Sequence, residues 1–306
     1  MTSSNVAAID IGTNSVRLLL TDGGGRELER SMRMTRLGQG IDVSGVLHPD
    51  AIARTVDVLS EYGARIESSG AGRRRAVATS AARDAANREP FFDAAERALG
   101  FRPELLSGED EALLSFQGAT AGLSAGEGPF LVVDIGGGST EFVLGSSAPE
   151  AAISVQIGCV RLTERHLKSD PPIRSELDAC FADATRALAS VRDVIDVRRA
   201  RRVLGLAGTV TSLSAMALGL ESYDPQRTHH SVLRRAEVEA LLVRLAAADL
   251  ESRRELLVQP QRAEVIVGGA VVLVAILREF TIDELLVSEH DILDGLAASL
   301  LSSTPA

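Results

Sequence analysis

The stretch Val6-Ala-Ala-Ile-Asp-Ile-Gly-Thr-Asn-Ser15 decides the fold, because the chain repeats it as Leu131-Val-Val-Asp-Ile-Gly-Gly-Gly-Ser139. Each copy has an apolar strand, an aspartate and a glycine turn that leads into a second strand. The backbone N–H groups of such a turn can cradle phosphate oxygens, because glycine permits close approach of the backbone. The repeat therefore predicts two related halves that bind one polyanion.

The composition excludes several classes of protein. A hydrophobic content of 45% with 24% charged residues is typical of a globular protein, and no apolar stretch has the roughly 20 residues that a membrane span needs. The chain begins without a signal-peptide pattern, so we expect a cytoplasmic protein without a membrane segment. The net charge of −10 argues against a protein that coats nucleic acid. The one lysine, Lys168, follows no glycine-rich loop, which excludes P-loop chemistry.

The pattern of elements predicts an α/β fold in each half. The first half has expected strands near 5–11, 15–22, 27–37, 75–78 and 102–106. Its expected helices lie near 49–68, directly after 78, near 90–99 and from Ser107, where Asp110 suggests a capping box. The second half has expected strands near 130–135, 139–145, 151–157, 202–206 and 284–288, and expected helices near 160–168, 173–197, 210–219, 235–248, 251–257, 262–280 and 291–302. A Gly-, Ser- and Ala-rich linker at 121–129 predicts domains 1–123 and 124–306, with the last helix able to pack back on the first domain.

The turns supply the candidate phosphate ligands. They are Thr13, Asn14 and Ser15 in the first copy, and Gly136, Gly137, Gly138, Ser139 and Thr140 in the second. A third glycine turn, 205–209, begins a helix whose N-terminus, with Gly208 and Thr209, can meet a further phosphate or a nucleotide. The alternative is that this turn only allows a helix to pack closely on a strand.

At these motifs the chain resembles the exopolyphosphatase and guanosine pentaphosphate phosphatase (Ppx/GppA) family, in the superfamily of actin and the sugar kinases. The resemblance rests on six segments, at 8–17, 77–83, 107–112, 133–141, 158–164 and 205–209. It implies two ribonuclease H-like domains that flank an interdomain cleft. It also implies a hydrolase in which water attacks the terminal phosphoryl group of a phosphoanhydride chain.

The resemblance implies that Glu111 is the general base, because the family places its catalytic glutamate in the segment Gly108-Glu-Asp-Glu-Ala112. The other reading is that Glu109, Asp110 and Glu111 only complement a helix N-terminus. Arg83 and Arg17 are candidate phosphate ligands, since a guanidinium matches phosphate oxygens, and Arg262 is a weaker candidate.

A divalent cation is expected beside the turns. Asp10, Asp134 and Glu141 are hard oxygen ligands of the kind that Mg²⁺ or Mn²⁺ prefers. The histidines lack the spacing of a zinc motif, and we expect His229 and His230 in a polar loop. Cys159 and Cys180 suggest neither a disulfide nor a thiolate metal site.

Features outside the turns bear on the length of the substrate. Arg161, Arg165 and Lys168 lie at helical spacing and form either a positive track for a phosphate chain or a solvated helix face. The chain lacks the extra helical C-terminal domain of longer family members, and Asp294 stands where many members have arginine. Both departures speak against a preference for long chains.

We therefore expect an exopolyphosphatase that acts on short inorganic polyphosphate chains with Mg²⁺ or Mn²⁺. One alternative is a hydrolase of guanosine pentaphosphate, and another is a regulator that binds guanosine penta- or tetraphosphate or a nucleotide without turnover. A sugar kinase would need a catalytic aspartate and sugar-binding insertions that the sequence does not show. Nucleic acid and membranes are not expected partners, and a homodimer is left open.

Overall fold

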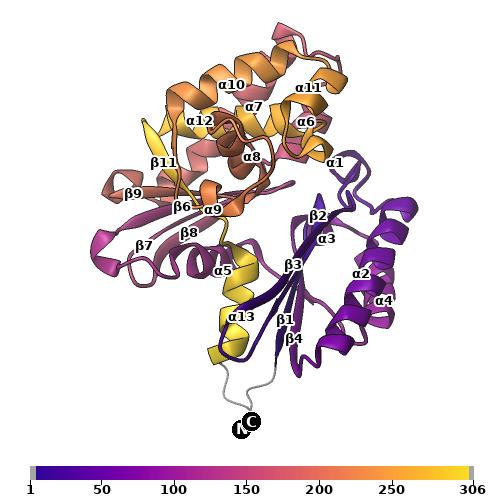
Figure 1. The fold of residues 1–306 in the computed structure, drawn as a ribbon. Coiled ribbons are helices and arrows are strands. Elements are labelled where there is room, and N and C mark those ends of the chain that lie inside the picture. The colour runs from indigo at the N-terminus through magenta and orange to yellow at the C-terminus, as the bar shows by residue number, and fades with distance from the viewer. Residues whose placement is uncertain (1–4, 303–306) are drawn as a thin grey trace. The chain divides into compact units, whose positions relative to one another are not determined.

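The computed structural model describes residues 5–302, which form two compact units (Figure 1). The first unit contains the chain up to Gly118 and the segment from Ile292 onward, and the second unit contains Ala119–Asp291. The limits expected from the sequence were 1–123 and 124–306, and the first unit instead ends at Gly118. The C-terminal helix, for which the sequence analysis allowed packing back on the first domain, belongs to the first unit because it packs on the first strand.

The first unit is built on a five-stranded mixed sheet. Its order is β3-β2-β1-β4-β5, in which β1, β2 and β3 are antiparallel neighbours and β1, β4 and β5 run parallel. The strands are β1 (Val6–Ile11), β2 (Ser15–Thr21), β3 (Glu27–Met34), β4 (Arg73–Ala78) and β5 (Glu104–Leu105). The helices are α1 (Ile41–Ser44), α2 (Pro49–Ser69), α3 (Ser80–Asp84), α4 (Arg88–Leu99), α5 (Gly108–Thr120) and α13 (Ile292–Ser302).

Helices cover both faces of this sheet (Figure 1). Successive side chains of a strand point to opposite faces, so Ile9 packs in the cluster with α2 and α4, while Ala8 packs in the cluster with α5 and α13. Gly295 of α13 lies against the backbone of Leu114 in α5, where a Cβ atom would overlap the Leu114 carbonyl group. The last helix therefore completes the core of the first unit.

The second unit repeats this topology. Its order is β10-β11-β9-β6-β7-β8, so the row β8-β7-β6-β9-β11 matches β3-β2-β1-β4-β5, with β6, β9 and β11 parallel. The strands are β6 (Phe130–Ile135), β7 (Thr140–Gly145), β8 (Pro149–Val155), β9 (Arg202–Leu206), β10 (Val232–Arg234) and β11 (Glu284–Val287). The helices are α6 (Cys159–His166), α7 (Arg174–Val194), α8 (Ala207–Ala217), α9 (Pro225–Thr228), α10 (Arg235–Ala247), α11 (Leu250–Leu256) and α12 (Ile266–Glu279), and the 3₁₀ turns are η1 (Ala125–Glu127), η2 (Val197–Arg199) and η3 (Pro260–Arg262).

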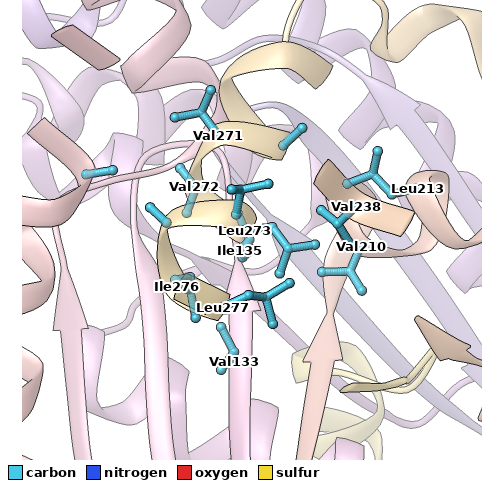
Figure 2. Packing of buried hydrophobic residues seen from close by; sticks show 14 of the residues in the cluster. Val133, Ile135, Val210, Leu213, Val238, Val271, Val272, Leu273, Ile276 and Leu277 are labelled. Atoms are coloured by element: carbon cyan, nitrogen blue, oxygen red, sulfur yellow. The ribbon is translucent and has the colours of Figure 1, made fainter. Parts of the chain in front are cut away.

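Helix α12 is the centre of the second core. All of its residues from Ile266 to Leu277 are buried, and Figure 2 shows Leu273 and Leu277 among side chains of β6, α8 and α10. No helix within residues 5–302 combines the length and the apolar character that crossing a membrane requires.

The structure confirms the α/β fold class and the two meanders. The structure has a helix, α3, directly after β4, as expected, but the sequence analysis missed α1, α9 and β10, which are too short to show a hydrophobic period. The helix expected from residue 262 begins at Ile266, because Pro260–Arg262 forms a separate 3₁₀ turn.

Candidate active site

The two glycine turns have the same backbone geometry. The Gly12 N–H donates to the Ser15 carbonyl at 3.0 Å, and the Gly136 N–H donates to the Ser139 carbonyl at 3.0 Å. Both turns follow the carboxyl end of a strand that has a parallel neighbour, β1 or β6. Ligands of open α/β sheets bind at this edge of the sheet.

In the first turn, backbone donors bind the carbonyl groups. The N–H groups of Thr35 and Arg36 donate to Asn14 O at 3.1 and 3.0 Å, and that of Gly38 donates to Thr13 O at 2.8 Å. Among residues 5–302, no acceptor is paired with the N–H groups of Thr13 and Asn14. The turn thus presents donors where an anion can bind.

In the second turn, backbone N–H groups at the start of α6 bind the carbonyl groups. The N–H groups of Cys159 and Val160 donate to the carbonyls of Gly136 and Gly137 at 3.0 and 2.9 Å. The N–H groups of Gly137 and Gly138 have no acceptor within the part of the chain that the structure describes. The helix approaches this closely because Gly158 has no side chain, and a Cβ atom there would overlap the Gly137 backbone.

Arg161 completes this support from α6. Its Nε donates to Gly138 O at 2.7 Å and its Nη2 donates to Gln156 Oε1 at 3.1 Å, and the residue is only 8% exposed. The sequence analysis considered Arg161 for the positive track, but helical spacing does not report burial. The other two residues considered for this track also have partners within the chain. Arg165 pairs with Asp183 at 2.9 Å, and Lys168 Nζ donates to the Glu164 carbonyl. The structure therefore favours local roles for all three.

The two turns differ in the residue opposite the aspartate. Asp10 faces Arg17 across β1 and β2, and Arg17 Nε and Nη2 both donate to Asp10 Oδ2, at 3.0 and 2.7 Å. Asp134 faces Glu141 across β6 and β7, so two buried carboxylates are cross-strand neighbours there. Ser154 Oγ donates to Glu141 Oε1 at 2.7 Å. An arginine thus faces the aspartate in the first unit, and a second carboxylate faces it in the second unit.

The ends of β4 and β5 bring Arg83 and Glu111 together. The Thr79 N–H donates to Ile11 O at 3.2 Å and the Leu106 N–H donates to Ala78 O at 3.0 Å, which aligns the ends of β1, β4 and β5. Arg83 Nη1 donates to Glu111 Oε2 at 2.6 Å and to Leu106 O at 3.1 Å. The two side chains are largely buried, at 17% and 13% exposure.

Three buried donors near this edge have no partner among the described residues: Asn14 Nδ2, Ser80 Oγ and Arg83 Nη2. Each follows the carboxyl end of β1 or β4. An unsatisfied buried polar group costs about 1–3 kcal/mol. A phosphate group, which offers several acceptor oxygens, is the kind of ligand that satisfies such donors.

The neighbouring acids have a different role from Glu111. Ser107 Oγ accepts from the Asp110 N–H at 3.0 Å and donates to Asp110 Oδ2 at 2.7 Å, so this pair caps α5. Glu109 is exposed. Of the three acids at the start of α5, Glu111 is the one that the structure pairs with Arg83.

The third turn is closely packed. The guanidinium of Arg262 occupies the space that a Gly208 side chain would fill. Thr209 is buried against Cys159 and Gly269, and burial raises the pKa of the Cys159 thiol. This favours the packing interpretation for Thr209, and phosphate binding by Gly208 and Thr209 stays a prediction.

The sequence analysis missed a cluster of histidines. The rings of His229 and His230 are stacked with centroids 3.7 Å apart, and those of His229 and His290 are 4.6 Å apart. Nothing local in the sequence could have signalled this cluster, since His290 lies on a different segment. In the described part of the chain, no group of three or more His, Cys, Asp or Glu side chains is arranged to hold a metal ion.

Comparison with known proteins places these features in a family. The model of the Ppx/GppA phosphatase family matches residues 21–304. Exopolyphosphatase 2 of Mycobacterium tuberculosis is 44% identical, over 98% of this chain and 99% of that protein. A guanosine-5'-triphosphate,3'-diphosphate pyrophosphatase of Vibrio atlanticus is 31% identical over 96% of this chain, but this covers only 59% of that protein.

Two solved structures of similar proteins have the same fold as this chain. The crystal structure of an exopolyphosphatase-like protein has a TM-score of 0.91 at 37% identity, covering 96% of this chain and 98% of that one. The Ppx/GppA family member of Aquifex aeolicus has a TM-score of 0.80 at 33% identity, covering 99% of both chains.

The support that Arg161 gives to the second turn leads to a binding prediction. The variant Arg161→Gln should weaken binding of pyrophosphate about tenfold, because the loss of one such hydrogen bond is worth about 1–1.5 kcal/mol. Calorimetric titration measures the affinity, and the melting temperature without ligand reports any loss of stability. Arg165→Gln, on the same helix but paired with Asp183, is the control and should bind as the unmodified protein does. Equal affinity in all three proteins would show that Arg161 does not shape the turn.

Proposed function

The chain belongs to the Ppx/GppA phosphatase family, and we propose that it hydrolyses inorganic polyphosphate, releasing the terminal phosphate. The observation that carries this proposal is the set of buried donors that have no partner among the described residues, Asn14 Nδ2, Ser80 Oγ and Arg83 Nη2, the last of which belongs to the arginine that pairs with Glu111. Membership alone does not choose between substrates. The relative with 44% identity over nearly its whole length is an exopolyphosphatase by name, which favours polyphosphate.

The turns bind phosphate oxygens in this proposal. The N–H groups of Asn14, Gly137 and Gly138 are oriented because the carbonyl groups of the preceding residues, Thr13, Gly136 and Gly137, are already bonded. Donors that are fixed before the substrate arrives need no reorganisation during the reaction, which is why such sites stabilise transition-state charge. Phosphoryl transfer depends mostly on positioning and on this kind of electrostatic stabilisation.

Arg83 links the base to the phosphate. Its Nη1 holds Glu111 Oε2, while its Nη2 is the donor without a partner among the described residues. One guanidinium can therefore orient Glu111 and bind a phosphate oxygen at the same time. Glu111 then accepts a proton from water, the water oxygen attacks the terminal phosphorus, and the bond to the bridging oxygen breaks to leave a shorter chain.

The residues present fit a divalent cation in the second unit. Asp134 and Glu141 are buried carboxylates on neighbouring strands, and oxygen ligands of this type suit Mg²⁺ or Mn²⁺. Asp10 fits less well as a direct ligand, because Arg17 already binds its Oδ2. A bound Mg²⁺ would supply positive charge to the phosphate oxygens.

Guanosine pentaphosphate is the second candidate substrate. The Vibrio relatives named for it are about 31% identical, although this chain spans only 59% of their length. Phosphate release from tripolyphosphate, a longer polyphosphate and guanosine pentaphosphate under one set of conditions separates the candidates. We expect kcat/KM for tripolyphosphate to exceed that for guanosine pentaphosphate by about tenfold or more. The reverse order would establish the second candidate, and tight binding without release would indicate a regulator.

Removal of the base should abolish turnover. Glu111→Gln keeps the hydrogen-bonding shape towards Arg83 but cannot accept a proton, so kcat should fall by about 10²–10⁴ while polyphosphate still binds. Stopped assays of phosphate release measure kcat, and titration measures binding. The matched control is Glu109→Gln, an exposed acid two residues away, which should retain normal turnover. Normal turnover in Glu111→Gln would remove Glu111 from the mechanism.

The proposed cation site predicts a change in metal requirement. Addition of EDTA should stop phosphate release, and Mg²⁺ should restore it. Glu141→Gln removes one of the facing carboxylates, so the Mg²⁺ concentration for half-maximal rate should rise about tenfold or more. Glu150→Gln, an exposed acid on the adjacent strand β8, is the control. An unchanged Mg²⁺ requirement in Glu141→Gln would argue against a cation ligated by Glu141.

A further inference from the structure

The loop of residues 35–39, which we call the docking segment, follows β3 and lies against the first glycine turn. Its Gly38 N–H donates to the Thr13 carbonyl at 2.8 Å. A Cβ atom at Gly38 would overlap Thr13 Cγ2 and would lie 3.2 Å from Ala81 Cβ, so this close approach requires glycine. The docking segment and the turn are therefore in direct contact.

The docking segment sets the position of Asn14. The N–H groups of Thr35 and Arg36 both donate to the Asn14 carbonyl, at 3.1 and 3.0 Å. The bond from Gly38 to the Thr13 carbonyl also orients the Asn14 N–H, because these two groups belong to one planar peptide unit. Asn14 offers two donors to a phosphate, this N–H and the buried Nδ2. A displaced docking segment would therefore move both donors.

The docking segment contains a strained residue. Arg36 has a φ of 52°, a left-handed conformation that residues other than glycine adopt at a cost in free energy. Such strain persists only where the surrounding structure holds the conformation. Leu37, which is fully buried in the first core, supplies one of these contacts. The Thr35 hydroxyl supplies none, because it has no partner among the described residues.

Arg54 of α2 binds both ends of the docking segment. Its Nε donates to the Thr35 carbonyl at 3.1 Å, and its Nη2 donates to Gln39 Oε1 at 3.2 Å. The Gln39 N–H in turn donates to the Arg36 carbonyl at 3.0 Å. One planar guanidinium thus joins the residue before the strained position to the turn that follows it. Arg54 is an exposed residue, so its replacement leaves the core of the first unit intact.

We propose that Arg54 is a positioning residue for the first glycine turn, which acts through the docking segment and does not touch the substrate. This rests on the proposed function, since it concerns the affinity of that turn for phosphate. With Arg54 in place, the docking segment stays on the turn, and both donors of Asn14 are oriented before the substrate binds. Without Arg54, the docking segment leaves the turn more often, and the protein binds phosphate fully only in its docked fraction.

The positive charge of Arg54 could also attract a polyanion directly. Lysine distinguishes the two effects, because it keeps the charge but lacks the planar pair of donors that spans Thr35 and Gln39. If position matters, Arg54→Lys should bind phosphate as weakly as Arg54→Gln does. Arg97→Gln, which removes an exposed arginine of α4, is the control for the loss of a surface charge in the same unit.

The test combines two measurements on the full chain. Calorimetric titration with tripolyphosphate, in EDTA to stop turnover, gives the dissociation constant. Amide hydrogen exchange of the unliganded protein, followed by mass spectrometry, reports how often the hydrogen bonds of the docking segment open. Both are applied to the unmodified protein, Arg54→Gln, Arg54→Lys and Arg97→Gln, and melting temperatures confirm that each variant is folded.

We expect the dissociation constant of tripolyphosphate to rise about fivefold in Arg54→Gln and in Arg54→Lys. Residues 35–38 should exchange faster in both variants, while the rest of the first unit exchanges as in the unmodified protein. Arg97→Gln should match the unmodified protein in both measurements. Unchanged affinity in Arg54→Gln would overturn the proposal, and so would weaker binding without faster exchange of the docking segment. Normal affinity in Arg54→Lys would assign the effect to charge and would also overturn it.

Phosphate release from tripolyphosphate in Mg²⁺ tests the proposed function separately. Release by the unmodified protein, together with unchanged affinity in Arg54→Gln, refutes the positioning role alone. Weaker binding by Arg54→Gln, without release by the unmodified protein, refutes hydrolysis alone. Absence of tripolyphosphate binding by the unmodified protein refutes both.

Discussion

Hydrogen bonds to the carbonyl groups of the two glycine turns are the constraint on which the site depends. A peptide group is planar, so a donor that fixes a carbonyl oxygen also fixes the direction of the adjoining N–H group. In the first unit these donors are backbone groups of residues 35–38, and in the second they are the start of α6 and the guanidinium of Arg161. The remaining N–H groups are thereby oriented before any ligand binds.

The two units share these hydrogen-bonded glycine turns but differ in the charges of the residues beside them. A cross-strand arginine in the first unit neutralises Asp10, and the nearby Arg83 and Asn14 leave donors without partners among the described residues. A cross-strand glutamate in the second unit gives a pair of carboxylates instead. The same topology thus yields one unit suited to anions and one suited to a cation with its anion.

Much of this could be predicted from the sequence, because the turns, the meanders and their polar residues are local in the chain. The pairing of Arg83 with Glu111 spans 28 positions, and the sequence analysis named both residues without predicting that they pair. The cluster of His229, His230 and His290 joins residues on different segments, so no pattern of spacing predicted it. Arg161 was assigned to the wrong environment, since helical spacing identifies a face but not what covers that face. The sequence analysis allowed the last helix to pack back on the first domain, and in the structure its contacts with β1 hold it there.

The position of α13 has a consequence for the order in which the protein can fold during synthesis. Ala8, Leu19 and Val77 of the first sheet are covered by Leu293 and Leu296, which the ribosome adds after the whole second unit. The second unit is one continuous segment and can complete its core earlier. The part of this face that α13 covers therefore stays open to water until the end of translation, which is the condition under which nascent chains associate wrongly or bind chaperones.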